Sequence, residues 1–590
     1  MQGSREGKVR LSTHTFAGIA NALTKKEPPH DEPEMMTRVE RRRAARKNRA
    51  AKAWKKAAAG AVAVATLFGG MGVASTALAA DRDSYQDTVG NATFEAARQQ
   101  YGLTKHMRNG AILHAWMWSF KNITANMEAI AKAGYTSVQT EPMSKIKYVP
   151  ANGKKFDENW YYVYQPSGTS IGNFVVGTED DLKEMTATAH KYGVRIIVDV
   201  VANHFTSDWD AIEPDWQNKA YFHNRNNCGD SDPKNPGTGD KIDYSNRWQV
   251  TQCHLLGLWD LNTQSQEVAD RMQSFLKTAV ADGVDGFRFD AAKHVELSDE
   301  LDNAKSNYWN TILKNGAQFQ YGEVLQGDSG LDYKAYADMF RDNSSDGGGN
   351  TASAYGGTVR AAIGSGNLST KMVQNISTGG ADEDQLVTWV ESHDNYANKE
   401  QTGSDGVKKG VSTELTDYQL MMGWAIVGSR KAGAPLYFNR PKESGGTRPQ
   451  FAEKSQLGDT GDDMWKNKSV VAVNHFRNAM DGKSEYLQNC GDKSCLMIER
   501  FTKDKQANDG VTIANMGGEQ NLAGMSTNLD DGTYPDEVNG GKLVVKNGKI
   551  ESGTAKANSV SVFYIKGKIL PYVSAEPASI DFSTDNVKVT

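Results

Sequence analysis

A repeated order of amphipathic helix, glycine and buried strand constrains the fold of this 590-residue chain more than any other feature. Four segments with apolar residues at helical spacing are each followed by a glycine and then by a short apolar run. The four runs are Ser137–Thr140, Arg195–Val201, Gly286–Asp290 and Ala434–Phe438. Glycine suits the left-handed position that ends a helix. Strands that alternate with helices pair in parallel, and unalternated apolar runs are typical of strands buried on both faces.

Two parallel architectures fit this order, a closed (β/α)8 barrel and an open doubly wound sheet. An open sheet that binds a nucleotide carries a glycine-rich phosphate loop after its first strand. The first expected strand, Ala111–Trp116, is followed by no such loop in the sequence. We therefore predict an α/β fold with a (β/α)8 TIM barrel.

Polar and charged clusters end four of the apolar runs. They are Asp199–His204, Gly286–His294, Tyr321–Val324 and Val390–Asp394. In a (β/α)8 barrel the carboxyl ends of all strands meet at one face, so these clusters can share one site. Two carboxylates that flank a bond, with a third nearby, are the groups that glycoside cleavage requires.

Charge is distributed unevenly along the chain. Residues 1–80 carry 15 basic and 6 acidic residues, whereas the whole chain has a net charge of −5, so the remainder is acidic. An acidic body argues against nucleic acid as a partner. It is compatible with a neutral substrate and with bound cations.

The basic N-terminal part predicts export. Arg38–Lys56 is densely basic, and Ala57–Ala80 follows with no charged residue and with small residues at Ala77 and Ala79. This order is typical of a secretory signal. The alternative is an uncleaved membrane anchor, which would leave the protein at the cell surface. We predict a leader over residues 1–80, a linker over 81–105, and a secreted, extracellular protein.

The four cysteines lie in the expected exported part, which favours disulfides. Cys490 and Cys495 bracket a short turn, so we expect them to pair with each other, which leaves Cys228 for Cys253. A structural zinc site is the alternative, but the two pairs lie far apart in the sequence and neither has CxxC spacing.

The expected barrel covers residues 106–470 and includes a long irregular insertion, domain B, at about 203–262. An insertion of that length is usually functional. Short strand-like runs separated by turns predict a β domain C, an antiparallel β-sandwich, over 471–568. Residues 569–590 read as a linker and the start of a truncated further β module.

Several stretches together resemble the α-amylase family, glycoside hydrolase family 13, and within it secreted bacterial enzymes of the saccharifying, bacillus type. The stretches are LHAWMWSF, WYYVYQP, VTQCHLLGLWDLNTQ, DGFRFDAAKHVEL, QYGEVLQ and LVTWVESHDNYAN. The resemblance implies the same organisation: a barrel, a domain B after the third strand and a β domain C.

The resemblance also implies roles for individual residues. Asp290 matches the nucleophile, Glu323 the general acid/base and Asp394 the third carboxylate. Residues that match substrate contacts are Trp160, Tyr161, Tyr164, Gln165, His204, Arg288, Lys293, His294 and His393. The charge of Arg288 would keep the nucleophile ionised. A calcium site is implied at Asn203, Thr251, Asp260 and His294, where Thr251 and His294 supply backbone carbonyls. His114, on the first strand, is interpreted as structural.

From these observations we expect a secreted, monomeric, calcium-binding α-amylase that cleaves internal α-1,4-glucosidic bonds with retention of configuration. Its substrates would be starch, glycogen and maltooligosaccharides. The first alternative is a family relative with transglycosylase activity or with specificity for α-1,6 bonds or short oligosaccharides. The second is a non-catalytic starch-binding surface protein.

Overall fold

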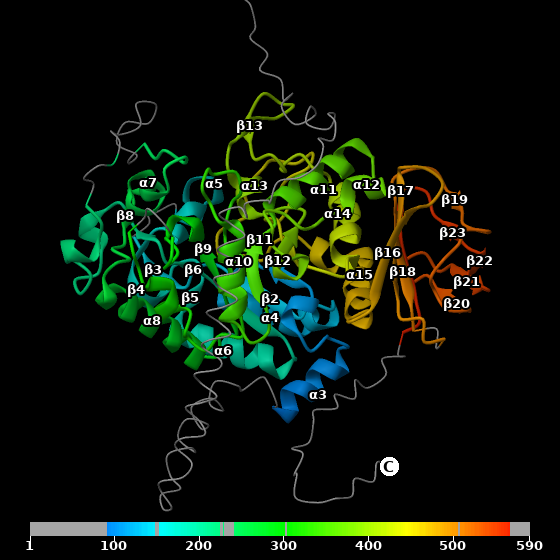
Figure 1. Ribbon diagram of the computed structural model, residues 1–590, viewed down its shortest axis with the longest axis horizontal. Coiled ribbons are helices and arrows are strands. Elements are labelled where there is room, and N and C mark those ends of the chain that lie inside the picture. The colour runs from blue at the N-terminus through cyan, green and yellow to red at the C-terminus, as the bar shows by residue number, and fades with distance from the viewer. Residues whose placement is uncertain are drawn as a thin grey trace, which may run out of the picture. The chain divides into compact units, whose positions relative to one another are not determined.

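The computed structural model describes residues 91–147, 153–224, 228, 241–300, 304–505 and 508–566 (Figure 1). The expected leader over residues 1–80 and the expected further module over 569–590 lie outside these ranges. No helix in the described part of the chain is both long enough and apolar enough to span a membrane.

Eight parallel strands close into a barrel, which confirms the predicted fold. In chain order they are β1 (Ile112–His114), β2 (Ser137–Thr140), β6 (Arg195–Val201), β9 (Gly286–Asp290), β10 (Phe319–Gly322), β11 (Gly348–Thr351), β12 (Leu386–Trp389) and β15 (Ala434–Phe438). Each strand pairs with its neighbours in sequence, and β15 pairs with β1 to close the ring. Strands β6 and β15 are buried along their whole length, as their unalternated apolar runs predict.

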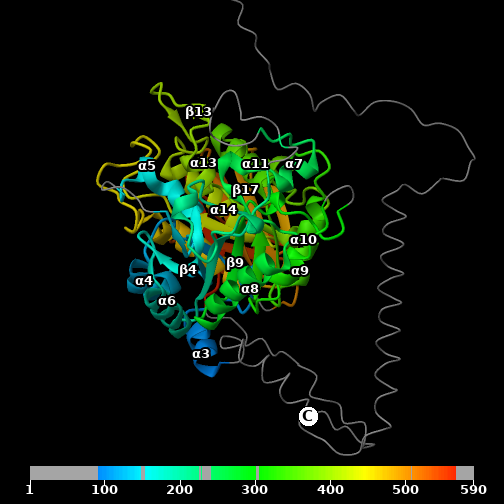
Figure 2. The ribbon, with the colours of Figure 1, turned by 90° about the vertical axis from the view of Figure 1, so that its left-hand side faces the viewer.

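Helices follow the barrel strands on its outside (Figure 2). They are α4 (Phe120–Lys132), α6 (Glu179–Lys191), α8 (Gln266–Ala281), α9 (Tyr308–Ile312), α10 (Tyr333–Asp342), α11 (Ser353–Ser365), α12 (Thr370–Val373), α14 (Asp417–Ser429) and α15 (Lys468–Ala479). Helix α6 shows why these segments are helical. Thr178 and Asp181 form a reciprocal capping box at its start, and Leu182, Met185 and Ala189 form its buried face.

One barrel strand was absent from the sequence interpretation. Strand β11 has the sequence GGNT and contains no apolar run. A Cβ atom on Gly348 would lie 2.1 Å from the Gln320 carbonyl oxygen, and one on Gly349 would lie 1.8 Å from that of Gln385. The two glycines are therefore required by the close approach of the neighbouring backbone, and they remove the signal by which a buried strand is recognised.

A small antiparallel sheet between β2 and α6 was also missed. It consists of β3 (Ser144–Ile146), β4 (Pro166–Asn173) and β5 (Gly177–Thr178). Domain B lies against it, because Thr206 N donates to the Pro166 carbonyl and Glu213 N donates to that of Ser167. The loop after the second barrel strand thus supports domain B.

Domain B itself is largely irregular. Strand β7 (His204–Phe205) pairs with β8 (Trp259–Asp260) and places His204 opposite Asp260. Between them, the described part holds the short helix α7 (Arg247–Gln252) and a disulfide between Cys228 and Cys253. The second disulfide joins Cys490 to Cys495, so both predicted pairings are confirmed.

The C-terminal strands form three antiparallel sheets, coloured orange to red in Figure 1. One sheet has the order β16 (Ser484–Asn489), β17 (Cys495–Phe501), β18 (Gly510–Asn515) and β24 (Ser559–Tyr564). The others are β20 (Gly532–Pro535), β21 (Lys542–Lys546) and β22 (Lys549–Ser552), and the pair β19 (Gln520–Asn521) and β23 (Thr554–Ala555). Helices α14 and α15 of the barrel contact β18 and β24.

The expected linker over residues 81–105 contains a helix, α3 (Ala92–Gln100). Its Phe94 side chain is buried, and the guanidinium carbon of Arg195 lies 4.6 Å from the centre of that ring. Because Arg195 begins strand β6, α3 packs against the barrel, and the linker prediction is wrong for these residues.

Candidate active site

A cavity of about 610 Å³ opens where the barrel strands end. Every residue that the sequence assigned to catalysis or substrate binding lines it: Trp160, Tyr161, Tyr164, Gln165, His204, Arg288, Asp290, Lys293, His294, Glu323, His393 and Asp394. These side chains come from segments up to about 230 positions apart in the sequence, and the barrel brings them together as expected.

The three carboxylates reach the cavity in different ways. Asp290 is the last residue of β9, and Glu323 directly follows β10. The sequence predicts that Asp394 ends a strand, but the structure places it beyond the strand end. Strand β12 ends at Trp389, and Asp394 lies in the first turn of the short helix α13 (His393–Ala397), whose N-cap is Ser392. Helix α13 therefore directs Asp394 toward the cavity from above the strand end.

Arg288 connects the buried carboxylates of the site. Its Nη1 lies 3.0 Å from Asp290 Oδ1, and its Nη2 lies 3.0 Å from Glu323 Oε2. Nη1 also donates to Asp199, at 2.8 Å from Oδ2. The backbone N–H of Ala291, which has a left-handed conformation, donates to Glu323 Oε2 at 2.9 Å. One guanidinium thus fixes the relative positions of Asp290 and Glu323.

Burial raises the pKa of Asp290 well above its usual value. Arg288 opposes this shift, whereas the negative charges of Glu323 and Asp199 add to it. The charge of Arg288 favours the ionised form of Asp290, as expected, but it is only one of several effects on this pKa. Arg288 also contacts Asp199 and Glu323, so its charge is shared among three carboxylates. Burial also raises the pKa of Asp394, against Arg288 and against hydrogen bonds with Glu323 and Asn398.

His204 and His393, two of the histidines that line the cavity, are neutral near pH 7. Burial lowers the pKa of His204 to about 4 and that of His393 to about 3. A neutral imidazole has one donor and one acceptor nitrogen, which suits binding to sugar hydroxyls. His204 Nε2 lies 3.2 Å from the Tyr164 carbonyl, and the ring of His393 stacks on that of Tyr164 with centroids 5.1 Å apart.

An aromatic surface lies on one 3₁₀ turn, Trp160–Tyr164, which Gln165 follows. The turn directs Trp160, Tyr161 and Tyr164 to the cavity, and Tyr161 is 41% exposed at its edge. Exposed or half-exposed aromatic rings in a cleft offer flat apolar faces on which sugar rings can stack.

Lys293 and His294 lie in a 3₁₀ turn after the nucleophile strand. Lys293 Nζ forms an ion pair with Asp328 Oδ2 at 2.8 Å and lies 4.9 Å from the centre of the Tyr244 ring. His294 Nδ1 lies 2.8 Å from the Val250 carbonyl, and burial lowers its pKa to about 3. The turn is thereby tied to α7 of domain B.

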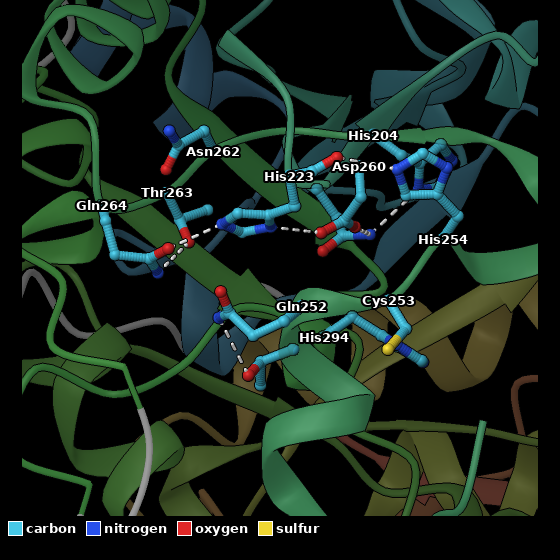
Figure 3. Close-up of polar contacts among 12 residues, drawn as sticks. His204, His223, Gln252, Cys253, His254, Asp260, Asn262, Thr263, Gln264 and His294 are labelled. Atoms are coloured by element: carbon cyan, nitrogen blue, oxygen red, sulfur yellow. Dashed lines mark hydrogen bonds and ion pairs between the residues drawn. The ribbon is translucent and has the colours of Figure 1, made fainter. Parts of the chain in front are cut away.

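Asp260 and His294, two of the predicted calcium ligands, lie among polar side chains of domain B and the barrel (Figure 3). The buried side chains of Asn203 and Asp260 are in contact, with Asn203 Nδ2 3.1 Å from Asp260 Oδ1. His223 Nδ1 lies 2.7 Å from the other oxygen, Oδ2. Thr251 is the residue after Val250, the contact of His294, so the segments of the two predicted carbonyl ligands are adjacent.

This donor set fits a calcium ion in its chemistry. It consists of a buried carboxylate, an amide oxygen and backbone carbonyls, which are hard oxygen ligands. His223 and Asn203 each engage one oxygen of Asp260, and a carboxylate has about four acceptor positions, so it retains the capacity to coordinate a further partner. Among the described residues no cluster of three or more His, Cys, Asp or Glu side chains is arranged to hold a metal ion. The predicted site does not depend on such a cluster, because one carboxylate supplies its charge.

Two buried acidic residues at the site, Asp199 and Glu141, have no role in the sequence analysis, although Asp199 begins one of the predicted clusters. Asp199 lies within the apolar run of β6, directly opposite Arg288 in the β6–β9 register. Glu141 directly follows β2 and contacts His114. A charged residue inside or at the end of a buried run was the available signal for both, because an unpaired charge there would be too costly to keep.

The fold and the cavity define the class of the protein, a (β/α)8 barrel with a carboxylate-lined cavity at the carboxyl ends of its strands. Residues 121–326 match the sequence model of the α-amylase catalytic domain. Over these residues the chain is similar to the catalytic domain of α-amylases.

The chain is also similar to proteins named α-amylase. The α-amylase of Clostridium acetobutylicum is 35% identical over 478 residues, which cover 79% of this chain and 55% of that protein. The α-amylase of Butyrivibrio fibrisolvens is 36% identical over 509 residues, which cover 79% of this chain and 49% of that protein. The chain thus spans about half the length of these relatives. The structure of α-amylase I from Eisenia fetida shares the fold, with a TM-score of 0.59, 19% identity and coverage of 79% of this chain and 97% of that one.

Proposed function

We propose that this protein is a retaining endo-α-amylase that hydrolyses α-1,4-glucosidic bonds in starch, glycogen and maltooligosaccharides. One observation carries the proposal: Asp290 and Glu323 contact the two terminal nitrogens of a single buried arginine at the floor of an open cavity. The shared arginine supports Asp290 as the nucleophile and Glu323 as the proton donor of a retaining glycoside cleavage, with Asp394 in the same cavity.

The first step breaks the glycosidic bond. Glu323 gives its proton to the glycosidic oxygen of the leaving sugar, while Asp290 attacks the anomeric carbon and forms a covalent glycosyl–enzyme. His204, His393 and Asp394 bind hydroxyl groups of the reacting sugar and favour its flattened, positively charged transition state. Arg288 holds both reacting carboxyl groups in place throughout.

In the second step water hydrolyses the covalent intermediate. Glu323, now ionised, takes a proton from the water, and the water oxygen attacks the anomeric carbon and releases Asp290. Two inversions give net retention. The aromatic surface of Trp160, Tyr161 and Tyr164 supports binding of a chain of sugars rather than of a single one.

We further propose that Asn203, Asp260 and the carbonyl oxygens of Thr251 and His294 hold a calcium ion. When bound, the ion would neutralise Asp260 and join domain B to the barrel, a structural role. The saccharifying, bacillus-type character, export by the N-terminal leader and a monomeric state are also part of the proposal. The two disulfides support export, because such bonds persist in oxidising compartments.

The product profile tests the function. Purified protein is incubated with amylose and with pullulan, products are separated by chromatography, and the anomer formed first is identified by NMR. We expect short maltooligosaccharides from amylose, little cleavage of pullulan and α-anomers first. Glu323→Gln and Asp290→Asn should each lose at least about 1,000-fold in kcat.

Each alternative gives a different result. Rapid pullulan cleavage, or cyclic or elongated products, would show an α-1,6 specificity or a transglycosylase and overturn the substrate assignment. Binding of starch with no turnover, and no difference between wild type and Glu323→Gln, would show a non-catalytic binding protein. Release of β-anomers first would contradict the retaining mechanism.

A further inference from the structure

Beneath the cavity lies a buried carboxylate that neither the predicted roles nor the mechanism uses. Glu141 directly follows β2 and is 0% exposed. Its Oε1 lies 2.9 Å from Nε2 of His114 on β1, which is also buried. His114 was interpreted as merely structural, but it is the partner of a charge placed at the end of a barrel strand, where the side chains of the active site lie.

The second oxygen of Glu141 holds a residue of the cavity wall. The hydroxyl of Tyr164 lies 3.1 Å from Glu141 Oε2 and 3.2 Å from Asp199 Oδ2. A phenol has a single proton, so it donates to only one of these carboxylates at a time. Both oxygens of Asp199 already accept hydrogen bonds from Arg288, whereas Glu141 contacts His114 through Oε1 and this hydroxyl through Oε2. Glu141 is therefore the better acceptor.

Glu141 is ionised in this environment. Burial alone would raise the pKa of its carboxyl group, but hydrogen bonds from His114 and Tyr164 favour the charged form, and the pKa is lowered. An ionised acceptor makes a stronger hydrogen bond than a neutral one. The hydroxyl of Tyr164 is thus anchored by a charge-assisted bond.

The anchor reaches the surface that the sugar would contact. The Tyr164 ring stacks on His393 at an interplanar angle of 10°, and the His393 ring meets His114 edge to face with centroids 5.7 Å apart. The Glu141–His114 pair therefore touches both members of this two-ring wall, Tyr164 through its hydroxyl and His393 through the His114 ring. Both rings line the cavity beside the catalytic carboxylates.

We propose that Glu141 is a positioning residue of the active site, which anchors the Tyr164 hydroxyl and so fixes the Tyr164–His393 wall against which the reacting sugar binds. This inference rests on the proposed function, since it assigns the wall to the reacting sugar. The competing view is that the Glu141–His114 pair only stabilises the barrel, as many buried ion pairs do.

A double-mutant cycle separates the two views. Glu141→Gln keeps the shape of the side chain and removes its charge, and Tyr164→Phe removes only the hydroxyl. Both variants and the double variant are assayed for kcat and KM on a maltooligosaccharide, with melting temperature measured in parallel. Glu499→Gln is the matched control, because Glu499 is a fully buried carboxylate in β17 of domain C and receives hydrogen bonds from Gln488 and Asn528.

If Glu141 acts through Tyr164, each single variant lowers kcat by about 10- to 100-fold, as small misplacement of a reactant does. The double variant should then have a kcat no lower than that of the less active single variant, because the two substitutions remove the same contact. Glu141→Ala should be worse than Glu141→Gln, since the amide still fills the site and supplies an acceptor oxygen. Glu499→Gln should lower the melting temperature alone.

Three results would overturn the inference. The first is a wild-type kcat in folded Glu141→Gln, and the second is an additive loss of kcat in the double variant. The third is a wild-type kcat in Tyr164→Phe, which contradicts the proposal even if Glu141→Gln does not fold. A wild-type protein without activity on amylose and maltooligosaccharides would instead overturn the proposed function, and the inference with it.

Discussion

Arg288 Nη1 lies 2.9 Å and 2.8 Å from the two carboxylate oxygens of Asp199. The same nitrogen lies 3.0 Å from Asp290, so the charge nearest the proposed nucleophile is already engaged by a second, fully buried carboxylate. Burial raises the pKa of Asp199 to about 6, against the charge of Arg288. Asp199 therefore limits how far Arg288 can favour the ionised form of Asp290.

Removal of the Asp199 charge should shift the pH dependence of the reaction. In Asp199→Asn, one negative charge that raises the pKa of Asp290 is lost, so that pKa falls. The nucleophile must be ionised, and activity disappears as the pH falls through its pKa. We therefore expect the acid limb of kcat/KM against pH to move to lower pH, although kcat itself decreases because Arg288 loses an anchor. The control Glu499→Gln should leave the limb in place, and a move to higher pH would contradict this account.

Calcium should stabilise the protein through Asp260. This side chain is the only full negative charge among the predicted ligands, so Asp260→Asn should remove most of the affinity. We expect a chelator to lower the melting temperature of wild type and added calcium to restore it, since saturation 100-fold above Kd contributes about 2.7 kcal/mol. Asp260→Asn should show no calcium-dependent shift.

The matched control for the calcium experiment is Asp509→Asn in domain C. Asp509 is fully buried and receives backbone hydrogen bonds from Thr502 and Asp530, so its loss destabilises the chain by itself. The calcium-dependent shift should nevertheless persist in this variant. If the melting temperature of the wild type is the same with chelator and with calcium, the proposed calcium site is wrong.

The fold could be predicted where buried strands contain continuous apolar runs. Strands β6 and β15 are buried on both faces, and their apolar runs showed it. Strand β11 has no apolar run, because glycines are needed at Gly348 and Gly349, where the neighbouring backbone approaches closely. A hydrophobic pattern of side chains does not reveal such a contact between backbones. Helix α3 was not predicted for a related reason. Phe94 is its only buried residue, so the sequence has no apolar residues at helical spacing that would indicate a helix.

The same contrast holds for the site. Asp290 and Glu323 could be located at the site because they lie at strand ends, and the family resemblance implied their roles. Glu141 and Asp199 could not, because their roles come from partners distant in sequence, Tyr164 and Arg288. A single sequence shows that a charge lies in a buried run but not which partner satisfies it. Register across the barrel supplies that information.

The two disulfides should contribute unequally to stability. Cys228 and Cys253 are 25 positions apart, whereas Cys490 and Cys495 are 5 apart. A longer closed loop restricts the unfolded chain more, and the chain-entropy relation gives about 3.5 kcal/mol for the first bond and about 2 kcal/mol for the second. Replacing both cysteines of each pair by alanine should therefore lower the melting temperature more for Cys228–Cys253. Equal losses, or a larger loss for Cys490–Cys495, would show that loop length does not govern the effect here.

Lys293 should govern binding of the sugar chain more than catalysis. Its ammonium lies in the cavity, paired with Asp328 and beside the Tyr244 ring, and it can donate to sugar hydroxyls without contacting the three carboxylates. A lost hydrogen bond from a charged group costs about 1.5–3 kcal/mol, so Lys293→Ala should raise KM for a maltooligosaccharide by about 10-fold or more with a smaller change in kcat. Lys334→Ala is the matched control, because Lys334 forms an ion pair of the same length, 2.8 Å, with Asp338 on helix α10 outside the cavity. Kinetics of both variants on a chain of defined length check the prediction. An unchanged KM in Lys293→Ala, or an equal rise in Lys334→Ala, would show that the cavity ammonium does not bind the substrate.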